Sequence, residues 1–109
     1  MADLLKESNL TVTDTTGGII VQGASSKTMT VISISLCETA GAAETFSIWR
    51  TDLNGSSNLF YIYHTQALGV RETFIHNDKI VLGPTSELWC GAGGTADIDV
   101  KVSYLEQDT

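Results

Sequence analysis

The segment from Asp97 to Glu106 alternates between hydrophobic and polar residues more regularly than any other part of the chain. Its hydrophobic positions are Ile98, Val100, Val102 and Tyr104, and the positions between them hold Asp99, Lys101 and Ser103. Successive side chains of a β-strand point to opposite faces, so this period of two predicts a strand with one buried and one solvated face. A helical period is nearly absent from the chain, and the sequence therefore predicts an all-β protein.

Further short runs rich in β-branched and aromatic residues are bounded by glycine, asparagine, serine or proline. They cover residues 8–14, 18–22, 29–37, 45–50, 59–64, 71–76, 79–82 and 87–90. Seven to nine short strands with frequent turns favour an antiparallel β-sandwich, with a jelly roll as one form of it. We expect a single sandwich domain over residues 15–109, preceded by a segment 1–14 that is either an N-terminal arm or the first strand.

Charge and composition restrict the classes of partner. The formal net charge is -7, and the six lysines and arginines are scattered, so we expect no nucleic-acid binding. No apolar run is long enough to cross a bilayer, and the sequence begins without the features of a secretory signal. We therefore expect synthesis in a reducing cytoplasm, with Cys37 and Cys90 as free thiols; a disulfide between them is the alternative.

Residues for catalysis or metal binding are few. His64 and His76 are the only histidines, and neither has a second ligand at metal-site spacing, so partly exposed imidazoles at strand ends are expected. The run GAGGTA, residues 91–96, lacks the lysine of a phosphate loop. We expect no metal, no cofactor and no enzymatic activity. Four aromatic residues allow either a carbohydrate-stacking platform or core and subunit contacts: Trp49, Tyr61, Tyr63 and Trp89.

Three of the expected strands, within residues 29–37, 45–49 and 59–63, carry no charge on the face that should meet water. An isolated sandwich exposes a polar face on each sheet, whereas small hydroxyl and aromatic residues lose little on desolvation. We therefore predict a subunit interface on these strands. Its residues are Val31, Ser33, Ser35, Thr45, Ser47, Trp49, Leu59, Tyr61 and Tyr63.

Two stretches resemble a known group of proteins. These are VISISLCETAGAAETFSIW at residues 31–49 and ELWCGAGGTADIDVKVSYLEQ at residues 87–107. Together they resemble the small β-sandwich accessory proteins in the virions of tailed bacteriophages, which act as capsid decoration (cement), head-fibre or tail components. The closing pattern of that group is matched by Leu88, Ala92, Ile98, Val100, Val102, Ser103, Tyr104 and Glu106.

The resemblance implies a non-catalytic virion protein that binds the major capsid protein as a homo-oligomer, with a trimer favoured over a dimer. We expect the segment 1–14 to act as a capsid-binding arm through Leu4, Leu5, Leu10 and Val12. The alternative function is a tail, adsorption or carbohydrate-binding subunit. A cupin-like metal enzyme would need more histidines than the chain has.

Overall fold

The computed structural model describes residues 3–52 and 59–108. Within these residues the chain forms nine β-strands and no helix, which confirms the all-β prediction. The strands are β1 (Asp3–Val12), β2 (Gly18–Gln22), β3 (Lys27–Glu38), β4 (Glu44–Asp52), β5 (Phe60–Leu68), β6 (Thr73–His76), β7 (Ile80–Leu82), β8 (Ser86–Ala92) and β9 (Ile98–Asp108).

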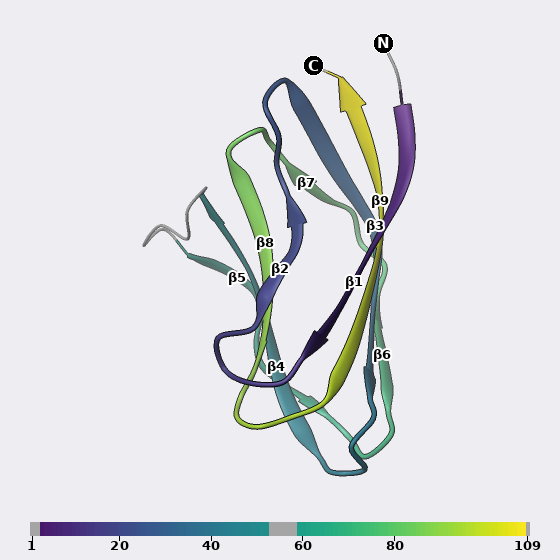
Figure 1. The fold of residues 1–109 in the computed structure, drawn as a ribbon, viewed down its shortest axis with the longest axis vertical. Helices are drawn as coiled ribbons and strands as arrows, with labels where there is room; N and C mark the ends of the chain where they lie inside the picture. Colours follow the sequence, from purple (N-terminus) through teal and green to yellow (C-terminus); the bar gives the residue numbers. More distant parts are fainter. Residues whose placement is uncertain (1–2, 53–58, 109) are drawn as a thin grey trace.

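The strands form two antiparallel sheets that pack face to face (Figure 1). Sheet A has the order β1-β9-β3-β6, and β7 pairs with the remaining part of β3, so β6 and β7 act as one interrupted edge strand. Sheet B has the order β2-β8-β4-β5. With β6 and β7 taken together, the two sheets have four strands each in the order of a jelly roll, as the sequence allowed.

The core lies between the sheets, and its largest members are branched aliphatic residues and one phenylalanine. β9 follows the predicted alternation: Ile98, Val100 and Val102 are buried, while Asp99 and Lys101 are exposed. The same period in β3 buries Ile34 and Leu36, and in β4 it buries Phe46 and Ile48. Burial of one face of each strand thus fixes the register of both sheets.

A β-bulge in β3 changes which side chains face the core. The pairing with β9 shifts between Val31 and Ser33, so that Ile32 is exposed and Val31 is fully buried. The prediction of Val31 at a subunit interface is therefore wrong. An extra residue in one strand changes the phase of the alternation on either side of it.

The segment 1–14 contributes a regular edge strand. β1 pairs with β9 over ten residue pairs, from Asp3 opposite Gln107 to Val12 opposite Ile98. Val12 is buried and Leu10 packs against the core, so the capsid-binding role predicted for these two residues is wrong. Leu4 and Leu5 lie near the start of β1 and are exposed.

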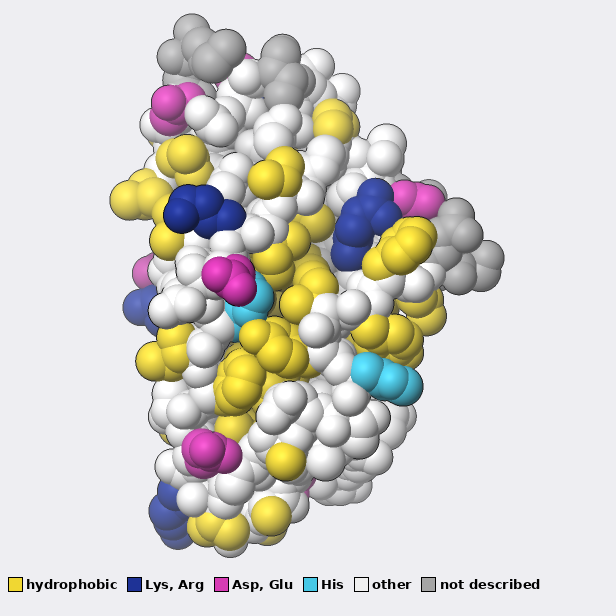
Figure 2. Space-filling model, turned by 180° about the vertical axis from the view of Figure 1, so that it is seen from behind, with side chains coloured by type: hydrophobic (Ala, Val, Ile, Leu, Met, Phe, Trp, Pro, Cys, Tyr) yellow, Lys and Arg dark blue, Asp and Glu magenta, His cyan; other side chains and the backbone are white. Residues whose placement is uncertain are grey.

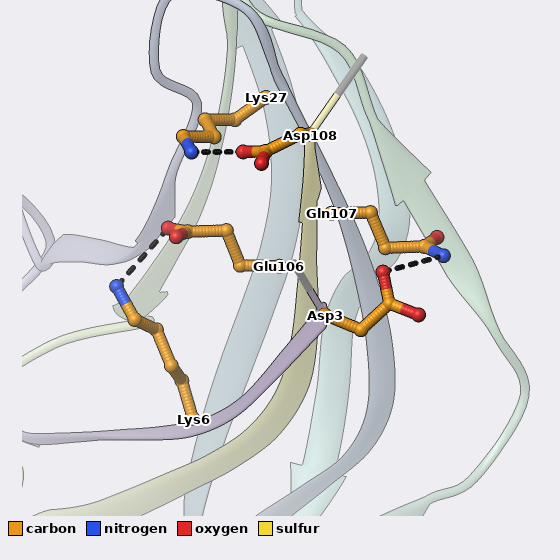
Figure 3. Close-up of polar contacts among 6 residues, drawn as sticks. All are labelled: Asp3, Lys6, Lys27, Glu106, Gln107 and Asp108. Atoms are coloured by element: carbon orange, nitrogen blue, oxygen red, sulfur yellow. Dashed lines mark hydrogen bonds and ion pairs between the residues drawn. The ribbon is translucent and has the colours of Figure 1, made fainter. Parts of the chain in front are cut away.

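The start of β1 and the end of β9 lie at the same end of sheet A, where polar side chains link neighbouring strands (Figure 3). Lys6 on β1 pairs with Glu106 on β9 at 3.0 Å, and Lys27 on β3 pairs with Asp108 on β9. Exposed ion pairs add little to stability. Their opposite charges instead favour the observed register of β1, β9 and β3.

A buried carboxylate joins two loops at the opposite end of β3. Glu38 is 1% exposed, and its Oε1 atom accepts hydrogen bonds from the backbone N–H groups of Gly41, Ala42 and Arg71 at 2.9, 3.2 and 3.0 Å. Its Oε2 atom accepts one from the N–H of Ala40 at 2.7 Å. These four donors, led by Arg71, stabilise the charged form and lower the pKa of Glu38 below its ordinary value near 4.5.

We expect the variant Glu38→Gln to be less stable than the wild type at pH 7, and the difference to shrink under acid conditions. A depressed pKa in the folded state contributes stability above the unfolded pKa, and this contribution is lost as the pH falls through the folded pKa. Urea unfolding of both proteins at pH 7, 5, 4 and 3 measures it. A stability difference that stays constant below pH 4 would contradict the assigned role of the charge.

Candidate binding surfaces

The nine residues of the predicted subunit interface do not form one surface. β3 belongs to sheet A, whereas β4 and β5 belong to sheet B, so their outward faces lie on opposite sides of the sandwich. Ser33 and Ser35 face outward from sheet A; Thr45, Ser47, Trp49 and Tyr61 face outward from sheet B. The prediction of a single interface is therefore corrected to two separate faces, with Val31 in the core.

The outward side of sheet A carries exposed hydrophobic residues, which we call the A face. Val81, Thr30, Leu105 and Leu5 form one row across β7, β3, β9 and β1. Val81 is 65% exposed, Leu5 75% and Ile75 62%. Ile32, two residues after Thr30 on β3, is also exposed. Leu5 and Ile32 also line a shallow hollow with Ser33 and Ser103.

The β3, β6 and β7 part of the A face is uncharged. Its other outward residues are Thr28, Thr30, Ser33, Ser35, Cys37 and Thr73. Charged residues on this side of sheet A, such as Glu7, Asp99 and Lys101, belong to β1 and β9. The neutral character predicted from the sequence of β3 therefore holds for three neighbouring strands.

The outward side of sheet B carries a row of aromatic residues, which we call the aromatic ladder. The rings of Trp89 on β8 and Trp49 on β4 are 6.2 Å apart between centroids, with an angle of 12° between their planes. Tyr61 on β5 lies 6.0 Å from Trp49, and His64 lies 4.3 Å from Tyr61. Three of the four aromatic residues predicted for a platform are thus brought together.

Tyr63, the fourth, faces the core and not the ladder. Its hydroxyl lies 2.7 Å from Nδ1 of His76, and burial raises the pKa of Tyr63 above its ordinary value. The reason is a bulge in β5: Trp49 pairs with Tyr61 and the adjacent Ile48 pairs with Tyr63. His76 is buried instead of partly exposed as expected, whereas His64 is exposed at the end of the ladder.

One side of the sandwich ends in two edge strands that do not pair with each other, β5 in sheet B and β6 with β7 in sheet A. The half-buried hydrophobic residues Ile62, Tyr63, Phe74 and Ile80 pack against the core. Figure 2 shows hydrophobic side chains that run down the middle of the molecule when it is seen from behind. The core therefore reaches the surface along this side.

Groups for covalent or metal chemistry are sparse within residues 3–52 and 59–108. Both cysteines are free, and burial raises the pKa of Cys90 to about 12, which makes its thiol unreactive at neutral pH. No cluster of three potential metal ligands occurs in this part of the chain. Among the same residues no helix has the length and hydrophobicity to span a membrane.

No family model matches the sequence, and the search of curated proteins found no significant match. Solved structures do match. A subunit of the disulfide-linked pili of Bacillus endospore appendages has a TM-score of 0.60 at 10% identity, covering 98% of this chain and 87% of that chain. The TNF protein Eiger from S. frugiperda has a TM-score of 0.52 at 6% identity, covering 98% and 92%.

A third match lies within a larger protein. The Clostridium thermocellum xylanase 10B, containing CBM22-1 and GH10 modules and complexed with xylohexaose, has a TM-score of 0.51 at 13% identity. The match covers 94% of this chain and 26% of that chain. At these identities the likeness shows the fold alone. A similar β-sandwich thus occurs in a pilus protein, in a TNF protein and in a protein with a carbohydrate-binding module.

Proposed function

We propose that the protein is a non-enzymatic structural subunit of a virus particle that assembles with copies of itself, as a decoration (cement) protein on the outside of a capsid. The observation that carries this proposal is the A face. It combines exposed Val81 and Ile75 with the uncharged outward residues of β3, β6 and β7. The resemblance to phage virion proteins and the fold shared with a pilus subunit support the same class of function.

Association through the A face follows from its chemistry. Contiguous exposed hydrophobic residues on a small protein mark an interaction surface, whereas single ones need no explanation. The absence of charge on the β3, β6 and β7 part keeps the cost of desolvation low. Closed symmetry is the usual outcome of self-association, and we propose a trimer formed in the host cytoplasm before attachment to the particle.

Attachment to the capsid would use the start of β1. Leu4 and Leu5 are exposed there, and β1 has only β9 as a partner within sheet A. An edge strand of this kind can pair with a strand of another chain, with the alternate side chains contacting pockets on the partner. Capsid binding, which the sequence suggested for an N-terminal arm, is therefore proposed for the unpaired edge of the folded strand β1.

The double variant Ile75→Lys with Val81→Lys tests the proposal. We expect the wild type to sediment as a symmetric oligomer and the variant as a monomer with an unchanged fold, because two lysines would have to lose their hydration in the interface. Sedimentation velocity at about 10 to 100 µM, concentrations at which specific interfaces of standard size associate, separates the two states.

The matched control is Val70→Lys, which adds a lysine at a position 55% exposed in the turn between β5 and β6. We expect this control to remain oligomeric. A monomeric wild type, or an oligomer that the double variant leaves intact, would contradict the proposed interface. Electron microscopy of the particle, with this chain traced on its surface, tests the virion assignment itself.

A further inference from the structure

The aromatic ladder is preorganised by two neighbouring residues of β8. The carboxylate of Glu87 is buried, and its Oε1 atom accepts a hydrogen bond from the indole Nε1 of Trp89 at 3.2 Å. Its Oε2 atom accepts one from the side-chain amide of Gln22, also at 3.2 Å. The buried Glu87 carboxylate, itself held by Gln22, therefore fixes the orientation of the Trp89 ring.

The ring of Trp49 has room in its observed position because Gly91 has no side chain. A Cβ atom at Gly91 would lie 3.0 Å from Cη2 of the Trp49 ring and 3.3 Å from its Cζ3 atom. The indole thus lies over the backbone of β8, in space that any other residue would partly fill. Rigid aromatic rings bind a ligand with little loss of conformational entropy, so this arrangement favours recognition.

The exposed area of the ladder is too small for a stable subunit interface by itself. Tyr61 is 49% exposed, and both tryptophans are half-buried. Because a tyrosine or tryptophan side chain offers about 150–250 Å², the three rings together expose at most about 300 Å². A specific protein interface takes about 800 Å² from each partner. The ladder therefore matches a small or narrow ligand better than a second copy of the chain.

The charges of sheet B restrict the ligand further. Arg50 is the only lysine or arginine in β2, β4, β5 and β8, and it contacts Ser86 Oγ at 2.9 Å and Asp52 at 3.5 Å. A nucleic acid stacked on the rings would need cations for its phosphates, and the net charge of -7 repels any anion. The ladder therefore does not suit an anionic ligand.

We propose that the aromatic ladder is a binding site for a neutral carbohydrate. The C–H groups on one face of a pyranose ring pack against aromatic rings, and its hydroxyl groups require polar partners at the rim. Exposed polar side chains flank the ladder at both ends, with Gln22 beside Trp89 and His64 beside Tyr61. Successive sugar units of a linear oligosaccharide would lie along the rings from β8 to β5.

Tryptophan fluorescence reports on this site directly, because Trp49 and Trp89 are the only tryptophans of the chain. The full-length protein is titrated with neutral hexasaccharides of glucose, xylose, mannose and N-acetylglucosamine. We expect at least one of them to change the emission in a saturable manner. The substitutions Trp49→Ala and Tyr61→Ala, the latter with both tryptophans intact, should each weaken binding about tenfold or more, as for central aromatic contacts in other interfaces.

The matched control is Phe60→Ala, which removes an exposed aromatic ring from the position next to Tyr61 but outside the ladder. Calorimetry with the best sugar measures binding independently of fluorescence, and we expect no change in this variant. The proposal is overturned if none of the sugars binds, or if Phe60→Ala weakens binding as much as Tyr61→Ala. It is also overturned if the ladder variants dissociate the oligomer while sugar binding persists. Loss of oligomers in the A-face variant does not affect this outcome, because the two faces are on opposite sheets.

Discussion

The substitution Phe46→Ala is expected to lower the free energy of unfolding by about 3 to 5 kcal/mol, the range for removing a fully buried phenylalanine. Phe46 projects from β4 into the core and is completely buried. Its ring lies 5.8 Å from that of Tyr63 on β5 and 5.2 Å from that of Phe74 on β6. Since β4 and β5 belong to sheet B and β6 to sheet A, these three rings join the sheets at the side where both end in edge strands.

Urea unfolding at pH 7 measures the effect, with Phe60→Ala as the control. The control removes a ring of the same size that is 60% exposed, and we expect it to change stability by no more than about 0.5 kcal/mol. The variant Phe46→Leu should cost about 1 kcal/mol because most of the volume is kept. Equal stabilities of Phe46→Ala and Phe60→Ala would show that the ring cluster does not hold the sheets together.

The fold class was accessible from the sequence because alternation and burial have the same period. A strand was predicted from Asp97 to Glu106, and the structure buries its hydrophobic residues Ile98, Val100 and Val102. The number of strands followed from turn residues between the apolar runs. Hydrophobic alternation and turn residues are local features, so each strand can be predicted from its own residues.

The arrangement of the strands was less accessible, because it depends on pairing between distant segments. The strands predicted within residues 29–37 and 45–49 were assigned to one subunit interface. In the structure β9 lies between β1 and β3, and β8 lies between β2 and β4, so the connection after Glu38 crosses to the other sheet. Nothing within the loop distinguishes a crossing of this kind from a hairpin.

Bulges were the other feature that local pattern did not reveal. They expose Ile32 and bury Val31 in β3, and in β5 they leave Tyr61 on the surface while Tyr63 faces the core. Gly91 follows the predicted strand 87–90 but lies inside β8 in the structure. A glycine in that position often marks a close approach of another group, here the Trp49 ring.

Gly17 is the position where we expect the second large loss of stability. Its φ angle is +64°, and the carboxylate of Asp14 accepts hydrogen bonds from the N–H groups of Thr16 and Gly17, at 3.1 Å each, in the turn before β2. A Cβ atom at Gly17 would lie 2.0 Å from the carbonyl oxygen of Cys90. The backbone of β8 can move away only if β2 separates from it.

The variant Gly17→Ala should therefore lose about 3 kcal/mol of unfolding free energy or more, because strain in the left-handed region adds to a backbone clash. The control Gly94→Ala adds a Cβ atom with nothing within 4 Å and should stay within about 0.5 kcal/mol of the wild type. Urea denaturation compares the two. Because β2 pairs with β8 through Ile19 and Trp89, the tryptophan emission of folded Gly17→Ala should also shift. An unchanged emission together with a stability equal to that of Gly94→Ala would mean that the turn accepts a side chain without moving β2.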